Sequence, residues 1–136
     1  MNSEKDFGIE KEKYSKTKLS EEKGLSYLST IKRFLIDEKL YLTPSLTLTV
    51  LSEKTEIPSK YISQLINQEL GKSFSDYLQE LRIEDVKKKL IDPGYHHLSI
   101  AGIASESGFA SSSRFNNQFK KIVGMTPSEY QKINTQ

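Results

Sequence analysis

The sequence lacks cysteine and long apolar runs. Without cysteine there can be no disulfide, no thiolate zinc site, no iron–sulfur cluster and no cysteine nucleophile. Without a long apolar run, no segment of this sequence is predicted to span a membrane, and its start does not resemble a secretory signal. Basic and acidic residues number 20 and 18, so the net charge is only +2, which excludes a histone-like, polybasic polymer binder.

Apolar residues are also scarce, at 35 % of 136 residues, against about 45–50 % in a typical globular domain. The shortage is concentrated in residues 1–24, of which twelve are charged and in which apolar residues lack helical spacing. Such a stretch buries too little to offset its ordering entropy. The sequence therefore predicts a charged linker or disordered tail over 1–24 and one folded region over 25–133.

From Leu25 onward apolar residues recur at helical spacing, and no window reads as a strand. This predicts an all-α fold of about seven helices, with Leu25 and Ile122 among the inward positions. The expected helices run from a Ser20 cap to a break at 41–44, then over 47–55, 59–70, 75–91, 99–107 and 111–123, and from 127 onward.

The chain also repeats itself at an offset of 53 residues, so that GKSFSDY (71–77) matches GMTPSEY (124–130). Both strings begin with a glycine suited to end a helix, and both continue into a predicted capping box, over 73–76 and 126–129. Upstream, Ile62 and Ile66 correspond to Phe115 and Phe119.

Each copy also has a tight turn between two helices. A small residue, Ser52 or Ala104, allows close helix crossing, and four residues later the turn needs a positive φ. Gly108 adopts that conformation without cost, whereas Glu56 does so at about 1 kcal/mol. The pattern predicts two helix-turn-helix units, over about 46–71 and 99–124, of the homeodomain-like three-helix kind, joined by a linking helix over about 75–91.

The outward faces of the second helices indicate DNA, because such a helix fits a major groove about 12 Å wide. Between Ser107 and Ser128 there is no acidic residue, and hydroxyls, amides and cations predominate. Such groups bond base edges and phosphates. The residues expected to face bases are Lys60, Ser63, Gln64, Asn67, Ser112, Ser113, Arg114 and Asn117. Those expected at phosphates are Thr47, Ser59, Ser111, Lys120 and Lys121.

Other features have plainer interpretations. Arg82 is expected to tie the linking helix to its neighbours through an Asp or Glu, and the 87–89 lysines to form a solvated cluster suited to a helix end. The histidines at 96–97 have no further ligand at metal spacing, and no catalytic constellation is found. The alternative to DNA binding is a helical protein–protein interaction module that uses the same exposed faces.

Residues 25–133 resemble the DNA-binding domain of AraC/XylS-type transcriptional regulators. The string IASESGFASSSRFNNQFKKIVGMTPSEYQK (103–132) is similar to that family's C-terminal signature. Three positions depart from it: Gln64, Asn117 and Gln131 stand where the family favours arginine. Because Asn and Gln prefer adenine while Arg prefers guanine, the sites read are expected to be shifted.

The resemblance implies a regulator, more often an activator than a repressor, with double-stranded DNA and RNA polymerase as partners. It implies dimerisation through a region absent from this chain and no small-molecule site or cofactor within it. In the family a sensor domain is usually N-terminal, and the 1–24 segment looks like its linker. A cytoplasmic location is expected, and the intact protein could be anchored to the membrane through such a sensor.

Overall fold

The computed structural model describes residues 19–135, and within that range it contains helices and no strands. The seven α-helices are α2 (Glu21–Lys32), α3 (Leu48–Thr55), α4 (Ser59–Leu70), α5 (Phe74–Leu90), α6 (Ile100–Glu106), α7 (Ser112–Val123) and α8 (Pro127–Asn134). A π-helical segment, η1 (Arg33–Asp37), continues α2, and two 3-10 turns, η2 (Leu40–Leu42) and η3 (Pro93–Tyr95), lie between the longer helices. The all-α prediction is confirmed.

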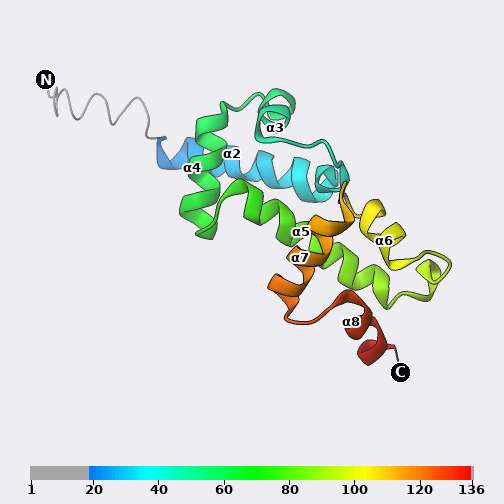
Figure 1. Ribbon diagram of the computed structural model, residues 1–136. Helices are drawn as coiled ribbons and strands as arrows, with labels where there is room; N and C mark the ends of the chain where they lie inside the picture. The colour runs from blue at the N-terminus through cyan, green and yellow to red at the C-terminus, as the bar shows by residue number, and fades with distance from the viewer. Residues whose placement is uncertain (1–18, 136) are drawn as a thin grey trace, which may run out of the picture.

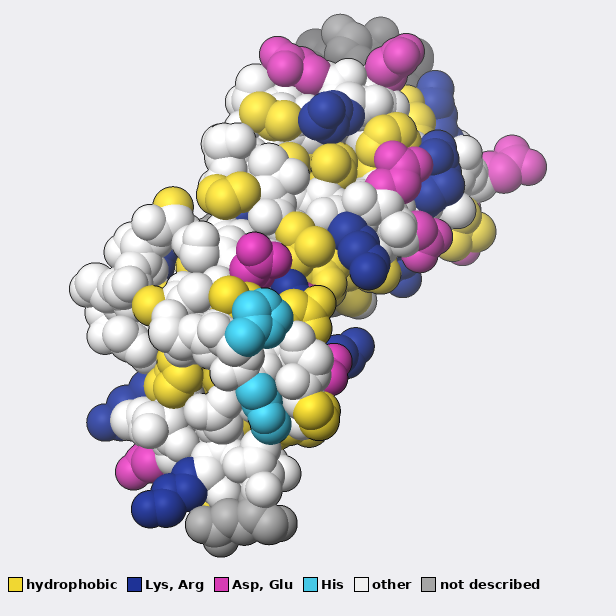
Figure 2. Space-filling model, turned by 90° about the vertical axis from the view of Figure 1, so that its right-hand side faces the viewer, with side chains coloured by type: hydrophobic (Ala, Val, Ile, Leu, Met, Phe, Trp, Pro, Cys, Tyr) yellow, Lys and Arg dark blue, Asp and Glu magenta, His cyan; other side chains and the backbone are white. Residues whose placement is uncertain are grey.

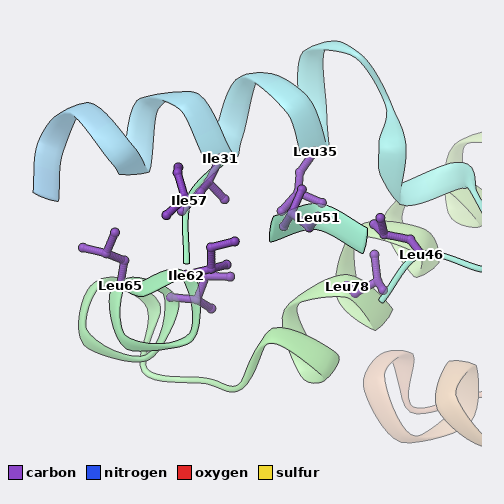
Figure 3. Packing of buried hydrophobic residues seen from close by; sticks show 9 residues of the cluster. Ile31, Leu35, Leu46, Leu51, Ile57, Ile62, Leu65 and Leu78 are labelled. Atoms are coloured by element: carbon purple, nitrogen blue, oxygen red, sulfur yellow. The ribbon is translucent and has the colours of Figure 1, made fainter. Parts of the chain in front are cut away.

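The first unit consists of α2, α3 and α4 packed against the beginning of α5. Its core is aliphatic, with Ile31 and Leu35 from α2 meeting Leu51 from α3 and Ile62 from α4 (Figure 3). These four side chains are at most 1 % exposed. Ile57, in the turn between α3 and α4, also points into this cluster and closes it (Figure 3).

The second unit consists of α6, α7 and α8 packed against the later part of α5. Its core combines aliphatic residues with a row of aromatic rings. The row begins at Phe109 and continues through Phe115 and Phe119 to Tyr130, with centroids 5.2, 5.8 and 5.8 Å apart. Edge-to-face and tilted pairs of this kind are favourable beyond their buried area. The repeat in the sequence thus encodes two similar units with differently composed cores.

Helix α5 joins the two units (Figure 1). It has 17 residues, so it is about 25 Å long at 1.5 Å per residue. Leu78 near its start belongs to the first core, while Val86 and Leu90 near its end belong to the second. The predicted linking helix is confirmed to within one residue at each end.

Side-chain caps fix most helix starts, as the sequence predicts. Thr47, Ser99 and Ser111 each accept a hydrogen bond from the backbone N–H three residues later, with distances of 3.0–3.2 Å. At Thr126 and Glu129 the capping box is reciprocal. The other predicted box is wrong in part: Ser73 accepts from the Asp76 N–H, but the structure records no return bond from the shorter Asp carboxylate.

The two turns have the predicted conformations. Glu56 has φ 60° and Gly108 has φ 104°, and both glycines that end the second helices, Gly71 and Gly124, are left-handed. At Gly108 a side chain is excluded for a second reason, because an added Cβ would lie 2.7 Å from both Arg82 Nε and the Tyr41 carbonyl oxygen.

Three details of the sequence analysis are corrected. Leu25 and Ile122 are 65 % and 40 % exposed, so neither is a core residue. On α2 and α7 the buried stripe is narrow and passes through Ile31 and through Phe115 and Phe119 instead. Residues 21–24, assigned to the charged segment, form the first turn of α2, where the Ser20 cap and two glutamates suit the helix dipole. Residues 1–18 of that segment lie outside the described residues.

Candidate DNA-binding surface

Helix α4 is the second helix of the first helix-turn-helix, and it turns a polar face outward. Ser63 and Asn67 are exposed and Gln64 is half-buried. Lys60 is also exposed, and its ammonium lies 5.1 Å from the centre of the Tyr61 ring. Ser59, at the first helical position, is half-buried, and no side chain caps this helix.

Helix α7 is its counterpart in the second unit and carries more positive charge. Arg114, Lys120 and Lys121 are all exposed, and the helix contains no acidic residue. Its remaining predicted contacts, Ser112, Ser113 and Asn117, are exposed as well. The opposite side of the helix is held by Phe115 and Phe119, which are at most 1 % exposed.

The structure brings predicted contacts from both units to one place. A hollow of about 350 Å³ lies between the units, and Thr47 of the first unit and Ser111 and Arg114 of the second all line it. The hydroxyls at 47 and 111 cap α3 and α7, so the positive ends of two helix dipoles meet here. No acidic side chain is among the residues that line this hollow.

Arg82 adds a second guanidinium to the hollow. Its pKa is lowered, first by burial and then by the positive charge of Arg114, although an arginine remains charged at any physiological pH. The two guanidiniums line the same hollow. The surface between the units is therefore positively charged, which suits a polyanion.

The role of Arg82 differs from the prediction. It was expected to bind a carboxylate, but its Nε donates to the Tyr41 carbonyl and its Nη2 to the Thr43 carbonyl, each at 2.7 Å. Two carbonyls at a turn provide acceptors without a second buried charge. Arg82 is thus structural, as predicted, but its partners are backbone atoms of the first unit.

Sequence reasoning missed a polar cluster beside Arg82, here called the junction cluster: Tyr41, Arg82, Asp85, Lys89 and Ser107. The Tyr41 hydroxyl donates to one Asp85 oxygen at 3.2 Å and the Ser107 hydroxyl to the other at 2.8 Å. Lys89 pairs with Asp85 at 2.6 Å, with side chains only 11 % and 15 % exposed. From the sequence, the 87–89 lysines are expected to form a solvated cluster. For Lys89 that prediction is wrong, because its side chain is largely buried in an ion pair.

Burial and then the neighbouring Asp85 carboxylate raise the pKa of Tyr41 to about 12. The hydroxyl is therefore protonated, and able to donate, throughout the physiological range. Asp85 and Lys89 have the i,i+4 spacing of a helical ion pair. No local pattern signals the rest of the cluster, because its members come from three segments that only the tertiary fold unites.

The remaining predicted features lie elsewhere. His96 and His97 are exposed directly after η3, on a face where basic and acidic side chains are interspersed (Figure 2). Gln131, one of the departures from the family pattern, donates to the Leu90 carbonyl at the end of α5, at 3.1 Å. None of the helices described over 19–135 is long and apolar enough to cross a membrane.

Comparison with known families agrees with this geometry. Residues 51–133 match the model of a helix-turn-helix domain family. This range begins within α3 of the first unit and takes in α4, the linking helix and the whole second unit. The chain belongs to this family, which is of the AraC type. It is a family of DNA-binding transcriptional regulators and not of enzymes.

Curated relatives have the same character. The chain is 33 % identical over 92 residues to the melibiose operon regulatory protein of Escherichia coli K12. The aligned segment covers 68 % of this chain and 30 % of that protein. The chain is 31 % identical over 111 residues to the transcriptional regulatory protein YesN of Bacillus subtilis, covering 80 % and 29 %. The chain thus spans about a third of the length of these relatives.

The chain covers a larger share of two solved structures than of these full-length relatives. The C-terminal domain of the two-component response regulator yesN from Fusobacterium nucleatum has a TM-score of 0.67 and 32 % identity, covering 78 % of this chain and 98 % of that one. The C-terminal domain of AraT, a response regulator from Geobacillus stearothermophilus, has a TM-score of 0.70 and 28 % identity, covering 79 % and 84 %. The fold is therefore that of a C-terminal domain of AraC-type regulators.

Proposed function

We propose that this chain reads a specific double-stranded DNA sequence by placing α4 and α7 in successive major-groove segments on one face of the duplex. The observation that carries the proposal is the pair of exposed polar helices, each held by its own core, on a single linking helix. In Figure 1 both helices run down the page, one in each unit. We expect their centres to lie about 34 Å apart, one turn of DNA, with the duplex bending if they are closer.

In this proposal one set of side chains contacts bases and another contacts phosphates. Base edges are read by Lys60, Ser63, Gln64, Asn67, Ser112, Ser113, Arg114 and Asn117. Phosphates are held by Thr47, Ser59, Ser111, Lys120 and Lys121. Exposure of the hydroxyl, amide and cationic groups on α4 and α7 supports the first set, and the helix-capping positions of Thr47 and Ser111 support the second, since helix N-termini favour phosphate.

The intact regulator has further expected properties. We propose that it acts in the cytoplasm, activates transcription through contact with RNA polymerase and dimerises through a region outside this chain. We expect the isolated domain to bind weakly, because few cations lie on α4 and α7 and about 4–7 phosphates would be neutralised. Dimerisation would then supply the added affinity. Anchoring to a membrane through an N-terminal sensor belongs to the same proposal about the intact protein.

Binding-site selection from random duplex DNA, followed by footprinting, tests the proposed function. We expect two protected segments about one helical turn apart, and a log–log salt slope of about −4 to −6. Exchange of an exposed lysine on α2, Lys32→Ala, is the control that should leave both unchanged. A chain that serves as a protein-docking module would retard no duplex even at low salt, and that result would refute the proposal.

A further inference from the structure

The two units have separate hydrophobic cores. The buried residues of the first cluster and those of the second are different sets, and α5 contributes to both. Helix α5 contacts α4 and η2 of the first unit and α6, α7 and α8 of the second. Apolar packing is non-directional, so these cores fix each unit more firmly than they fix the angle between the units.

Directional contacts across this junction come from the junction cluster. The Asp85 carboxylate, on α5, accepts a hydroxyl from Tyr41 of the first unit and another from Ser107 of the second. One side chain is thus bonded to both units at once. Lys89 holds the same carboxylate and also donates to the Glu106 carbonyl, at 3.3 Å, at the end of α6.

Arg82 and Gly108 complete the contact. The Arg82 guanidinium binds two carbonyls of the first unit, at Tyr41 and Thr43. The turn of the second unit rests against that same guanidinium and the Tyr41 carbonyl, so closely that even a methyl group at Gly108 has no room. Rotation of one unit about α5 would therefore break hydrogen bonds and leave buried polar groups unpaired, which is costly.

The relative angle of the units matters for DNA binding because groove segments of the double helix recur at a fixed distance and rotation. One added base pair moves the next groove segment about 3.4 Å along the axis and about 34° around it. A domain with a rigid junction meets that change with only one helix in register. A domain with a loose junction can follow it.

On the basis of the proposed function, we propose that the junction cluster is a spacing ruler: it fixes the angle between α4 and α7 and so sets how many base pairs separate the two sub-sites that the domain accepts. Tyr41, Arg82, Asp85, Lys89 and Ser107 act as positioning residues. They determine specificity without touching a base.

The test compares spacing profiles. The selected operator is lengthened or shortened by one base pair between its sub-sites, and affinities are measured for the wild type, for the double variant Tyr41→Phe/Ser107→Ala and for Glu80→Gln. The double variant removes both hydroxyls from Asp85 with little change of shape. The control removes the 2.6 Å ion pair between Lys72, which precedes α5, and Glu80, which lies on α5. This pair belongs to the first unit and does not cross the junction.

We expect the wild type and Glu80→Gln to lose about 100-fold or more per inserted base pair, because simultaneous engagement of both units is lost. The double variant should lose about tenfold or less, because its units reorient, and should bind the native spacing somewhat more weakly. A double variant that is folded and keeps the wild-type spacing profile would overturn the proposal, as would a uniform loss of affinity at every spacing.

A second measurement follows the junction without DNA. The chain has no cysteine, so spin labels attach only to introduced ones, at Glu53→Cys on α3 and Ser128→Cys on α8, both exposed positions. We expect a narrow distance distribution in the wild type and a broader one in the double variant. Equal widths would refute the ruler. A wild type that protects only one groove segment would instead refute two-unit binding, so the two failures are distinguishable.

Discussion

The two helix-turn-helix units have one architecture built from different side chains. The first unit is aliphatic at its core, and its second helix has one basic and one acidic residue, Lys60 and Glu69. The second unit adds a row of buried aromatic rings, Phe109, Phe115 and Phe119, to the aliphatic residues of its core, and its second helix has three basic residues and no acidic one. The spacing of buried positions and helix ends is therefore what defines the motif, while core composition and surface charge are free to differ.

The comparison also suggests a division of labour. At the offset of 53 the cations of α7, Arg114, Lys120 and Lys121, correspond to Tyr61, Asn67 and Gln68 of α4. Phosphate attraction should thus come mainly from the second unit, while the first reads with neutral groups.

The largest expected effect is on the aromatic core. Phe119 is fully buried between Phe115 and Tyr130, and Phe119→Ala should cost about 3–5 kcal/mol of unfolding free energy. Its counterpart Ile66 is also fully buried, and Ile66→Val should cost about 0.5–1.5 kcal/mol. Urea unfolding measures both changes, and amide NMR should show α6–α8 affected more than α2–α4 by Phe119→Ala. A loss in Phe119→Ala below about 3 kcal/mol, or amide shifts spread equally over both units, would contradict the idea that the second core depends on its ring stack.

The turns give the next effect, with opposite signs in the two units. Gly108→Ala forces a β-carbon against Arg82 Nε and the Tyr41 carbonyl at positive φ, and should cost about 2–3 kcal/mol. Glu56 already pays the left-handed strain at φ 60°, so Glu56→Gly should stabilise by about 0.5 kcal/mol after the entropy of the unfolded chain is allowed for. Thermal unfolding of both variants checks this. Two changes of the same sign would show that the turns are not equivalent.

These turns also show what the sequence could reveal. Helix ends, caps and the positive φ at Glu56 and Gly108 follow from local chemistry, because the residues that decide them lie within four or five positions of one another. The repeat made those local signals specific, since the same pattern occurs twice. Fold class, linking helix and the two reading helices were therefore predictable.

What could not be predicted depends on contacts distant in the chain. Tyr41, Asp85 and Ser107 meet only because η2, α5 and the end of α6 come together, and nothing near Tyr41 or Ser107 in the sequence marks Asp85 as their partner. The prediction that Leu25 is buried was wrong for a related reason. Helical spacing identifies an apolar stripe, but the neighbouring element that covers the stripe decides which of its residues are buried. The site residues on α4 and α7 remain predictions, and DNA binding experiments decide them.

Arg114 provides the third prediction, on affinity. It is the guanidinium at the first turn of α7, and it is exposed. Arg114→Ala should cost about 1–3 kcal/mol on the best operator and flatten the preference at one base pair, because Arg bonds guanine in a bidentate fork. Lys120→Ala should instead weaken all sequences about equally and reduce the salt slope by about one.

Binding-site selection with both variants separates these roles. Because Arg114 lines the hollow between the units together with Thr47 and Ser111, the opposite outcome is informative. If Arg114→Ala lowers affinity uniformly and keeps the wild-type motif, the residue is a phosphate anchor. Base reading in the second unit would then fall to Ser112, Ser113 and Asn117. Asn67→Ala, at the position of α4 that corresponds to Lys120, is the matched control and should leave the salt slope unchanged.

The smallest effect is expected at the start of α8, where the reciprocal cap distinguishes the second unit from the first. The backbone N–H of Thr126 donates to Glu129 at 2.9 Å. This bond, followed by the interaction with the Thr126 side chain, holds the pKa of Glu129 below its ordinary value. A carboxylate with a lowered folded-state pKa adds stability above its unfolded pKa, and that stability is lost as the pH falls through the folded value. Glu129→Gln should therefore flatten the acid limb of stability against pH slightly, measured by urea unfolding between neutral pH and about pH 3. Thr126→Ser keeps both hydrogen bonds and is expected to retain the wild-type limb. If Glu129→Gln left the acid dependence of stability unchanged, the charge of the Glu129 carboxylate would not contribute to the stability that the capping box provides.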